Sequence, residues 1–169
     1  MNSATATLCL SNRQRACRLD LRLLRRITNT LVRDLMKVDG FDLGLFLVDA
    51  PEIVRLNERF LHHAGPTDVI TFDYAQEPPP PPGGSAAGNQ ADHCLGLHAE
   101  VFVCVGQAAA QARRFRTTWQ SELVRCIVHG ILHLRGFDDR SPRLRRRMKR
   151  AEDRYLRQLA RRFDLSRLG

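Results

Sequence analysis

The sequence HGILHLRGFDD, residues 129–139, holds two histidines, two glycines and two neighbouring aspartates. Residues four apart in an α-helix lie on one face, about 6 Å apart along the axis. His129 and His133 have this spacing, so their imidazoles can bind one ion. Gly136 predicts the end of the helix, because glycine readily adopts the left-handed conformation that stops helices. The chain can then turn back and deliver a carboxylate, and three protein ligands leave a fourth position for water, as in catalytic zinc sites.

Two helices are predicted around this motif. Thr117 and Gln120 have the spacing of a capping box for the motif helix. Ser141 and Pro142 suit the cap and first position of a final helix, which we expect over 141–163. The core stripe of the motif helix is Leu123, Ile127 and Ile131, and that of the final helix is Leu144, Met148, Ala151, Tyr155 and Leu159.

The rest of the chain alternates strand and helix patterns. Strands are predicted over 4–10, 43–48, 69–74 and 95–104, the last with one wholly apolar face. One helix begins after an Asp20 cap, and another after Asp49 with Pro51 in its first turn. At 169 residues the chain is expected to form a single domain over 1–169. The predicted fold class is α+β, a mixed sheet of about four strands packed with about five helices and a metal site at the end of a central helix.

Residues 75–93 interrupt this pattern with five consecutive prolines at 78–82, followed by glycines and small polar residues. We expect an exposed Pro/Gly-rich loop between two strands, a solvated insertion rather than an SH3-type ligand. The five cysteines contain no C-x-x-C pair, which argues against a zinc knuckle or a disulfide scaffold.

The net charge of +9 lies entirely after the motif, since residues 140–169 hold 12 Lys or Arg and three acids. Such a surface attracts polyanions, of which a nucleic acid backbone is the commonest inside cells. The arginines from 143 to 162 could equally be the solvated side of an amphipathic helix. No apolar run approaches the roughly 20 residues of a membrane span, and the N-terminus lacks the apolar core of a secretory signal. A cytoplasmic location without membrane contact is expected.

The spacing His-x-x-x-His-x-x-Gly-x-x-Asp is also that of metzincin proteases, which have a glutamate as general base directly after the first histidine. That position is Gly130 here, so we rank a metalloprotease last among the functions considered below. Glu122 and Cys126 share the helical face of His129. Glu122 could orient an imidazole or could be a surface residue. His62, His63, His93 and His98 lack ligand spacing, and we expect them to face solvent.

The motif resembles the signature H-G-x-L-H-L-x-G-[YF]-D-H of the YbeY family of bacterial endoribonucleases and ribosomal RNA maturation factors. Every position from His129 to Asp138 is compatible, but the final histidine, the family's usual third ligand, is Asp139 here. This correspondence implies His129, His133 and Asp139 as metal ligands. Asp138 is the competing candidate for the third ligand. With Asp139 as the ligand, we expect Asp138 to cap the helix or to support the ligands.

A second block, LNERFLHHAGPTDVITF over 56–72, resembles the family element L-N-x-x-[YF]-R-x-x-[DE]-x-P-T-[DN]-V-[LI]-[ST]-F. The arginine that the family is taken to use in RNA cleavage falls on Leu61. Arg59 lies about 200° around a helix from that position and is a poor substitute.

The resemblance implies a metal-dependent, single-strand-specific endoribonuclease acting in 16S rRNA maturation and quality control of the small ribosomal subunit. Ribosomal RNA and the small subunit are then the expected partners, and no general base is implied. One Zn²⁺ per chain is expected, with Mn²⁺ or Mg²⁺ possible because a carboxylate favours harder ions. The alternative is a non-catalytic ribosome-assembly factor that keeps the metal for folding, suggested by Leu61. Neither the native metal nor the oligomeric state follows from the sequence.

Overall fold

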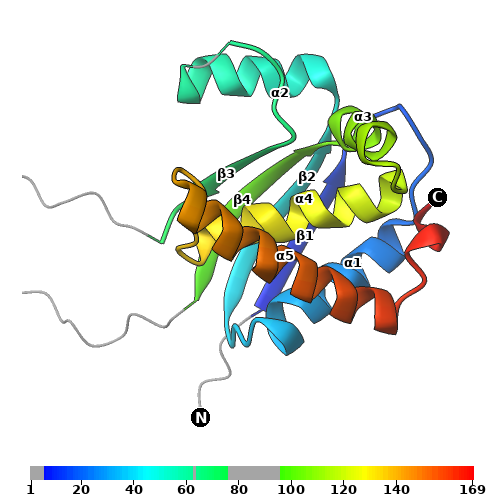
Figure 1. Ribbon diagram of the computed structural model, residues 1–169, viewed down its shortest axis with the longest axis vertical. Helices are drawn as coiled ribbons and strands as arrows, with labels where there is room; N and C mark the ends of the chain where they lie inside the picture. The colour runs from blue at the N-terminus through cyan, green and yellow to red at the C-terminus, as the bar shows by residue number, and fades with distance from the viewer. Residues whose placement is uncertain (1–5, 63, 76–95) are drawn as a thin grey trace, which may run out of the picture.

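The computed structural model describes residues 6–62, 64–75 and 96–169 and contains one mixed four-stranded sheet (Figure 1). The spatial order of the strands is β1-β2-β4-β3, with β1, β2 and β4 parallel and β3 antiparallel at one edge. Their bounds are β1 Ala6–Asn12, β2 Phe41–Val48, β3 Val69–Asp73 and β4 Leu97–Cys104. All four predicted strands are therefore confirmed within a few residues at their ends.

Five α-helices accompany the sheet: α1 Leu21–Asn29, α2 Ala50–Leu56, α3 Val105–Phe115, α4 Trp119–Leu134 and α5 Pro142–Arg162. The first two continue as π-helical turns, η1 Thr30–Leu35 and η2 Asn57–Leu61, and a 3-10 turn, η3 Leu165–Leu168, ends the chain. The predicted α+β class, with four strands and five helices, is confirmed. The expected Pro/Gly-rich loop lies outside the described residues except for residue 75.

Side chains that cap the helices agree with most of the sequence expectations. Asp20, Asp49 and Ser141 accept hydrogen bonds from the first-turn amides of α1, α2 and α5. The capping box predicted from Thr117 and Gln120 is wrong by one residue. Thr118 is the cap of α4, and its hydroxyl accepts from the Ser121 amide.

The sheet separates two apolar clusters because alternate residues of a strand point to opposite faces. The larger cluster lies on the face covered by α1, α4 and α5, which cross in front of the sheet in Figure 1. The smaller one, on the other face, joins Ile53 of α2 to the strands through Val48, Ile70, Phe102 and Cys104. The motif helix α4 is therefore held between sheet, α3 and α5, which fixes the position of its histidines.

Gly130 lets α4 approach β3 and β4 closely. A Cβ at this position would lie 2.9 Å from Val69 Cγ2, 3.1 Å from Val101 Cγ1 and 3.2 Å from Thr71 Cγ2. The glycine therefore sets the separation of helix and sheet next to His129. No helix within the described ranges has the length and apolarity needed to cross a membrane.

Candidate metal centre

The end of α4 turns the chain back toward the two histidines. Gly136 has a φ of +81°, its amide donates to the His133 carbonyl at 2.9 Å, and the Phe137 amide donates to the Leu132 carbonyl at 3.0 Å. This pair of bonds is the Schellman motif, which satisfies the last carbonyls of a helix. The predicted stop at Gly136 is thus confirmed, and the loop that follows brings Asp139 beside the helix.

In each histidine, the Nδ1 atom points away from the candidate metal site and contacts an oxygen atom. Nδ1 of His133 lies 3.1 Å from the Phe137 carbonyl, which can only accept, so this nitrogen carries the proton. Nδ1 of His129 lies 2.8 Å from Oε1 of Glu152 on α5. When Glu152 is ionised, that nitrogen is also the donor. Metal-binding histidines are commonly oriented in this way by an acceptor on the outer nitrogen.

The inner nitrogens face each other, with the two Nε2 atoms 3.0 Å apart. If both Nδ1 atoms are protonated and both rings are neutral, two lone pairs meet at this distance, an arrangement that a shared cation stabilises. Two nitrogens on a tetrahedral zinc ion, each bound at about 2.05 Å, would lie about 3.3 Å apart. The donor pair therefore fits a metal ion with little movement.

Asp139 completes a three-residue group. One ligand atom from each of His129, His133 and Asp139 can be chosen such that all lie within 4.8 Å of one another, and all three residues are partly buried. This set could hold a metal ion at the end of α4. A donor set of two nitrogens and one oxygen suits zinc, for which it would leave a fourth position for water, and it accepts harder divalent ions.

The carboxylate of Asp138 makes hydrogen bonds within its own loop. Its Oδ1 accepts from the amides of Asp139 and Arg140, at 2.7 and 3.1 Å, and its Oδ2 accepts from Arg140 Nε at 2.8 Å. The hydrogen bonds from the Arg140 guanidinium and amide lower the pKa of the Asp138 carboxyl. Its oxygens fold the loop into the shape that presents Asp139, the supporting role expected from the sequence.

Glu152 is the residue of this site that sequence reasoning missed. Glu122, the candidate for orienting an imidazole, is only 2% exposed but bonds to the Thr117 hydroxyl and lies 3.5 Å from Arg125. The acceptor on His129 comes instead from α5, where Glu152 lies 3.6 Å from the same arginine. The available signal was a glutamate among the apolar inner positions of the final helix.

The charge around His129 is negative. Burial disfavours the imidazolium, but the hydrogen bond and charge of Glu152 outweigh it and raise the pKa of His129 above its ordinary value. Asp68 and Asp139 act in the same direction. The carboxylates that favour a proton here also favour a divalent cation, because both are positive charges at one position.

Asp68 connects the second sequence block to this region. Its Oδ2 accepts from Gln111 Nε2 of α3 at 2.8 Å and lies 4.0 Å from Cys126 Sγ of α4. The thiol of Cys126 is buried, burial raises its pKa, and it belongs to the packing rather than to the ligand set. The block therefore anchors the edge strand β3 against the helix that carries the site.

Leu61, at the family arginine position, ends η2 and has an exposed fraction of 44%. The next residue, His62, is exposed and left-handed, with a φ of +54°. His98 is also exposed, as expected, with Nε2 3.8 Å from an Asp42 oxygen. His63 and His93 lie outside the described residues.

Gly130 argues against a protease of the metzincin type. The Cβ distances above leave no room for a glutamate side chain on this face of α4 without displacing the sheet. The position therefore serves close packing and cannot supply a general base.

A solved structure has the same fold. The solution structure of TM1509 from Thermotoga maritima superposes with a TM-score of 0.58, covering 90% of this chain and 89% of that one, at 24% identity.

Sequence relatives carry the name Endoribonuclease YbeY. The relative from Chlorobium luteolum is 39% identical over 107 residues, 63% of this chain and 66% of that protein. The one from Salinibacter ruber is 37% identical over 114 residues, 68% of each chain, and the one from Chlorobium phaeobacteroides is 31% identical over 132 residues, 76% of this chain and 83% of its own. The chain spans less than two thirds of the Chlorobium luteolum and Chlorobium phaeovibrioides proteins, 66% and 58%.

The family described as Endoribonuclease YbeY matches residues 10–160, which include the end of β1, the strands β2 to β4, the helices α1 to α4 and most of α5. The match contains the three residues of the candidate metal centre and the carboxylate that supports it. With a matching fold, relatives above 30% identity and a match over most of its length, this chain belongs to the YbeY family.

Proposed function

We propose that this protein is a metal-dependent endoribonuclease that cleaves single-stranded RNA, acting in maturation of 16S ribosomal RNA and quality control of the small ribosomal subunit. The relatives named Endoribonuclease YbeY support RNA cleavage. The observation that carries the proposal is the facing pair of Nε2 atoms, 3.0 Å apart, with Asp139 beside them. Ribosomal RNA within the small subunit is the proposed partner.

Zinc is the proposed metal, one per chain, held by His129, His133 and Asp139. Two imidazoles favour zinc, while the carboxylate lowers the net charge of the site and moves its preference toward Mn²⁺ or Mg²⁺. Compared with three neutral histidines, one carboxylate reduces the charge of the loaded centre from +2 to +1, so its water is less acidic.

The reaction proposed is hydrolysis of a phosphodiester. The bound metal would supply Lewis-acid activation of water or of a phosphate oxygen. Glu152 and the Phe137 carbonyl hold the two imidazoles with their inner nitrogens toward that position. Asp138 shapes the loop that carries the third ligand. These contacts preorganise the ligands before RNA arrives.

The test compares purified wild type with His133→Ala and with His98→Ala as the matched control. His98 is an exposed histidine on the strand β4, outside the three-residue centre. Metal content by mass spectrometry and cleavage of a single-stranded RNA are measured for all three. We expect His133→Ala to lose both metal and cleavage, and His98→Ala to keep both. Full cleavage by a metal-free His133→Ala protein would overturn the proposal.

The second candidate function is a non-catalytic assembly factor stabilised by its metal. Leu61 favours it, because the family arginine is absent at that position. Removing the metal distinguishes the two functions. An apo protein that stays folded but no longer cleaves RNA indicates the enzyme. A holo protein that does not cleave RNA, and that unfolds when its metal is removed, indicates the assembly factor. The exposed Leu61 also allows Leu61→Arg, which we expect to raise cleavage of the enzyme.

A further inference from the structure

Helix α5 carries six arginines on one line. They recur at intervals of four and three residues, the spacing that keeps side chains on one face of a helix. These residues, the α5 arginine stripe, are Arg143, Arg147, Arg150, Arg154, Arg157 and Arg161. All six are exposed. The 18 residue-to-residue steps from Arg143 to Arg161, at about 1.5 Å each, give the stripe a length of about 27 Å.

The stripe faces away from the metal centre. Glu152, which bonds to His129, is on the inner side of α5. At about 100° per residue, Arg150 and Arg154 lie about 160° around the helix from it. By the same measure Arg147 and Arg157 lie about 140° away. The stripe is therefore a surface separate from the candidate metal centre.

The guanidinium groups of the stripe are not taken up by carboxylates. Across residues 6–62, 64–75 and 96–169, no ion pair within 4.0 Å involves any of the six. The nearby Asp153 is instead neutralised by Arg125, at 2.7 Å, and Lys149, at 3.8 Å. Nε of Arg157 donates to the Asp153 backbone carbonyl at 3.1 Å. Among the described residues the stripe therefore has no carboxylate partner, and its guanidinium groups can bind an external anion.

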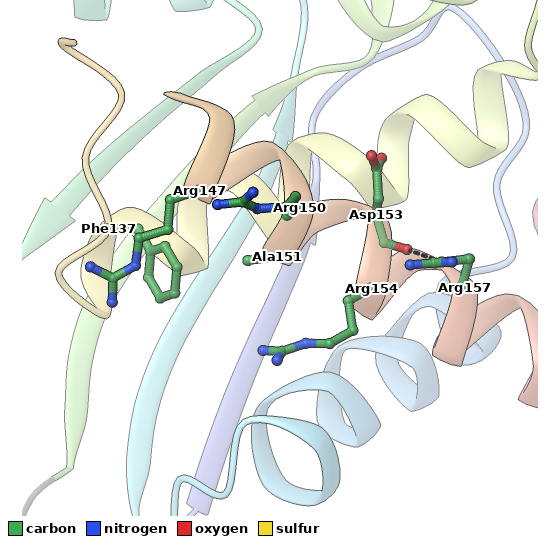
Figure 2. Close-up of a pocket in the computed structure, with 7 residues that line it drawn as sticks. All are labelled: Phe137, Arg147, Arg150, Ala151, Asp153, Arg154 and Arg157. Carbon is green, nitrogen blue, oxygen red and sulfur yellow. Dashed lines mark hydrogen bonds between the residues drawn. The ribbon is translucent and has the colours of Figure 1, made fainter. Parts of the chain in front are cut away.

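Aromatic rings position two of these arginines. The Arg147 guanidinium lies 5.2 Å from the ring centre of Phe137, and that of Arg154 lies 4.8 Å from the ring centre of Tyr155. Stacking on a ring orders a guanidinium while leaving its N–H groups available. Figure 2 shows Phe137 beside Arg147, with Arg150, Arg154 and Arg157 following along the helix. These residues, with Ala151 and Asp153, line a hollow of about 600 Å³.

We propose that the α5 arginine stripe is a second RNA-binding surface, which grips the phosphodiester backbone without reading its sequence. The inference rests on the proposed function in taking RNA as the polyanion, but the surface is distinct from the site of cleavage. A line of guanidiniums about 27 Å long matches the regularly spaced charge of a backbone rather than a single small anion. An RNA bound there is held on the same domain as the centre that cuts it, on the other side of α5.

The same helix is poorly suited to a membrane surface. An interfacial helix inserts its apolar face between lipids. The apolar face of α5, formed by Met148, Leu156 and Leu159, is buried against the rest of the domain. Only the charged side is free, which favours the nucleic acid backbone over a lipid bilayer.

The test is direct RNA binding by the full chain. The variant R147Q/R150Q/R154Q/R157Q removes four charges of the stripe, and R15Q/R33Q/R55Q/R113Q removes four from exposed positions elsewhere. Binding to a fluorescein-labelled single-stranded RNA is followed by anisotropy with EDTA present, so that no cleavage intervenes. Thermal unfolding checks that both variants remain folded, which their exposed positions lead us to expect.

The expected signature is in the salt dependence. Four lost phosphate contacts at about 0.7 each reduce the slope of log affinity against log salt by about 3. The advantage of the wild type over the stripe variant should therefore shrink about 50-fold between about 50 and 200 mM salt. We expect the control variant to keep a slope closer to the wild type.

Three outcomes would overturn the inference: equal slopes for the two variants, a larger loss in the control, or unchanged RNA binding with lost binding to vesicles containing anionic lipid. Failure of the proposed function is recognised separately. A wild-type protein that never cleaves RNA, yet binds it through the stripe, refutes the nuclease and supports the second surface. If the wild-type protein cleaves RNA and the stripe variant binds RNA as tightly as the wild type, the nuclease is supported and the second surface is refuted.

Discussion

Glu152→Gln should weaken metal binding while leaving every proposed ligand in place. The wild-type carboxylate lies 2.8 Å from Nδ1 of His129, and its side chain is 11% exposed. The amide of glutamine has nearly the same shape, but it carries no charge and can present an NH₂ group to the ring. The imidazole then loses its negative acceptor and becomes a weaker donor toward a metal.

The expected loss of metal affinity follows from the role of the hydrogen bond between Glu152 and His129. Loss of the acceptor behind a metal-binding histidine typically costs 10- to 100-fold in metal affinity, or about 1.4 to 2.7 kcal/mol. We expect the upper half of that range because the bond is short, charged and mostly buried. Burial limits the ability of water to replace the lost partner.

Glu122→Gln is the matched control. Both glutamates are buried and approach Arg125, at 3.5 Å for Glu122 and 3.6 Å for Glu152, but only Glu152 contacts a histidine. Both variants should lose stability by about 1 to 3 kcal/mol, through the weakened pair with Arg125. Zinc affinity, measured by competition with a chromogenic chelator, should fall only in Glu152→Gln. Equal zinc affinities of the two variants would refute the argument.

Three further variants, with Gly106→Ala as the control for the first, test the packing and the ligand assignment. Gly130→Ala should lower the free energy of unfolding by about 1 to 3 kcal/mol from overpacking against Val69, partly offset by about 1 kcal/mol of helix propensity. Gly106→Ala, whose Cβ would meet nothing nearer than 3.9 Å, should be neutral or stabilising in the same denaturant titration, and a stable Gly130→Ala would contradict the close approach. Asp139→His should raise zinc affinity relative to manganese affinity in paired chelator competitions, and an unchanged ratio would argue against this ligand. Asp138→Asn should keep wild-type metal content, because its oxygens serve the loop; loss of the metal would make Asp138 the ligand instead.

Local sequence determined the ends of the elements and the pair of histidines. The caps Asp20, Asp49 and Ser141 and the stop at Gly136 were predictable because each depends on hydrogen bonds or dihedral angles of adjacent residues. The four strands were also predictable, from short runs of apolar, β-branched and aromatic residues and, for β4, from apolar positions that alternate with a period of two. Thr118 displaced Thr117 as the cap because two adjacent threonines make a one-residue shift possible within local rules.

Long-range packing decided the features of the fold that the spacing of residues in the sequence does not specify. The strand order β1-β2-β4-β3 depends on how the crossovers pack, and no local pattern records it. Asp138 and Asp139 are adjacent and chemically identical, and only the folded loop gives one of them to Arg140 and the other to the histidines.

The sequence by itself determined that two imidazoles share a helical face near a turn, because an α-helix repeats every 3.6 residues. Only the tertiary structure decided that Glu152, 23 residues after His129, would stand behind that imidazole. It likewise decided that Glu152 faces the metal centre, so that the α5 arginine stripe lies on the other side of the helix. A helix fixes the angles among its own side chains, but the neighbours that each side chain meets depend on how the helices pack against the sheet.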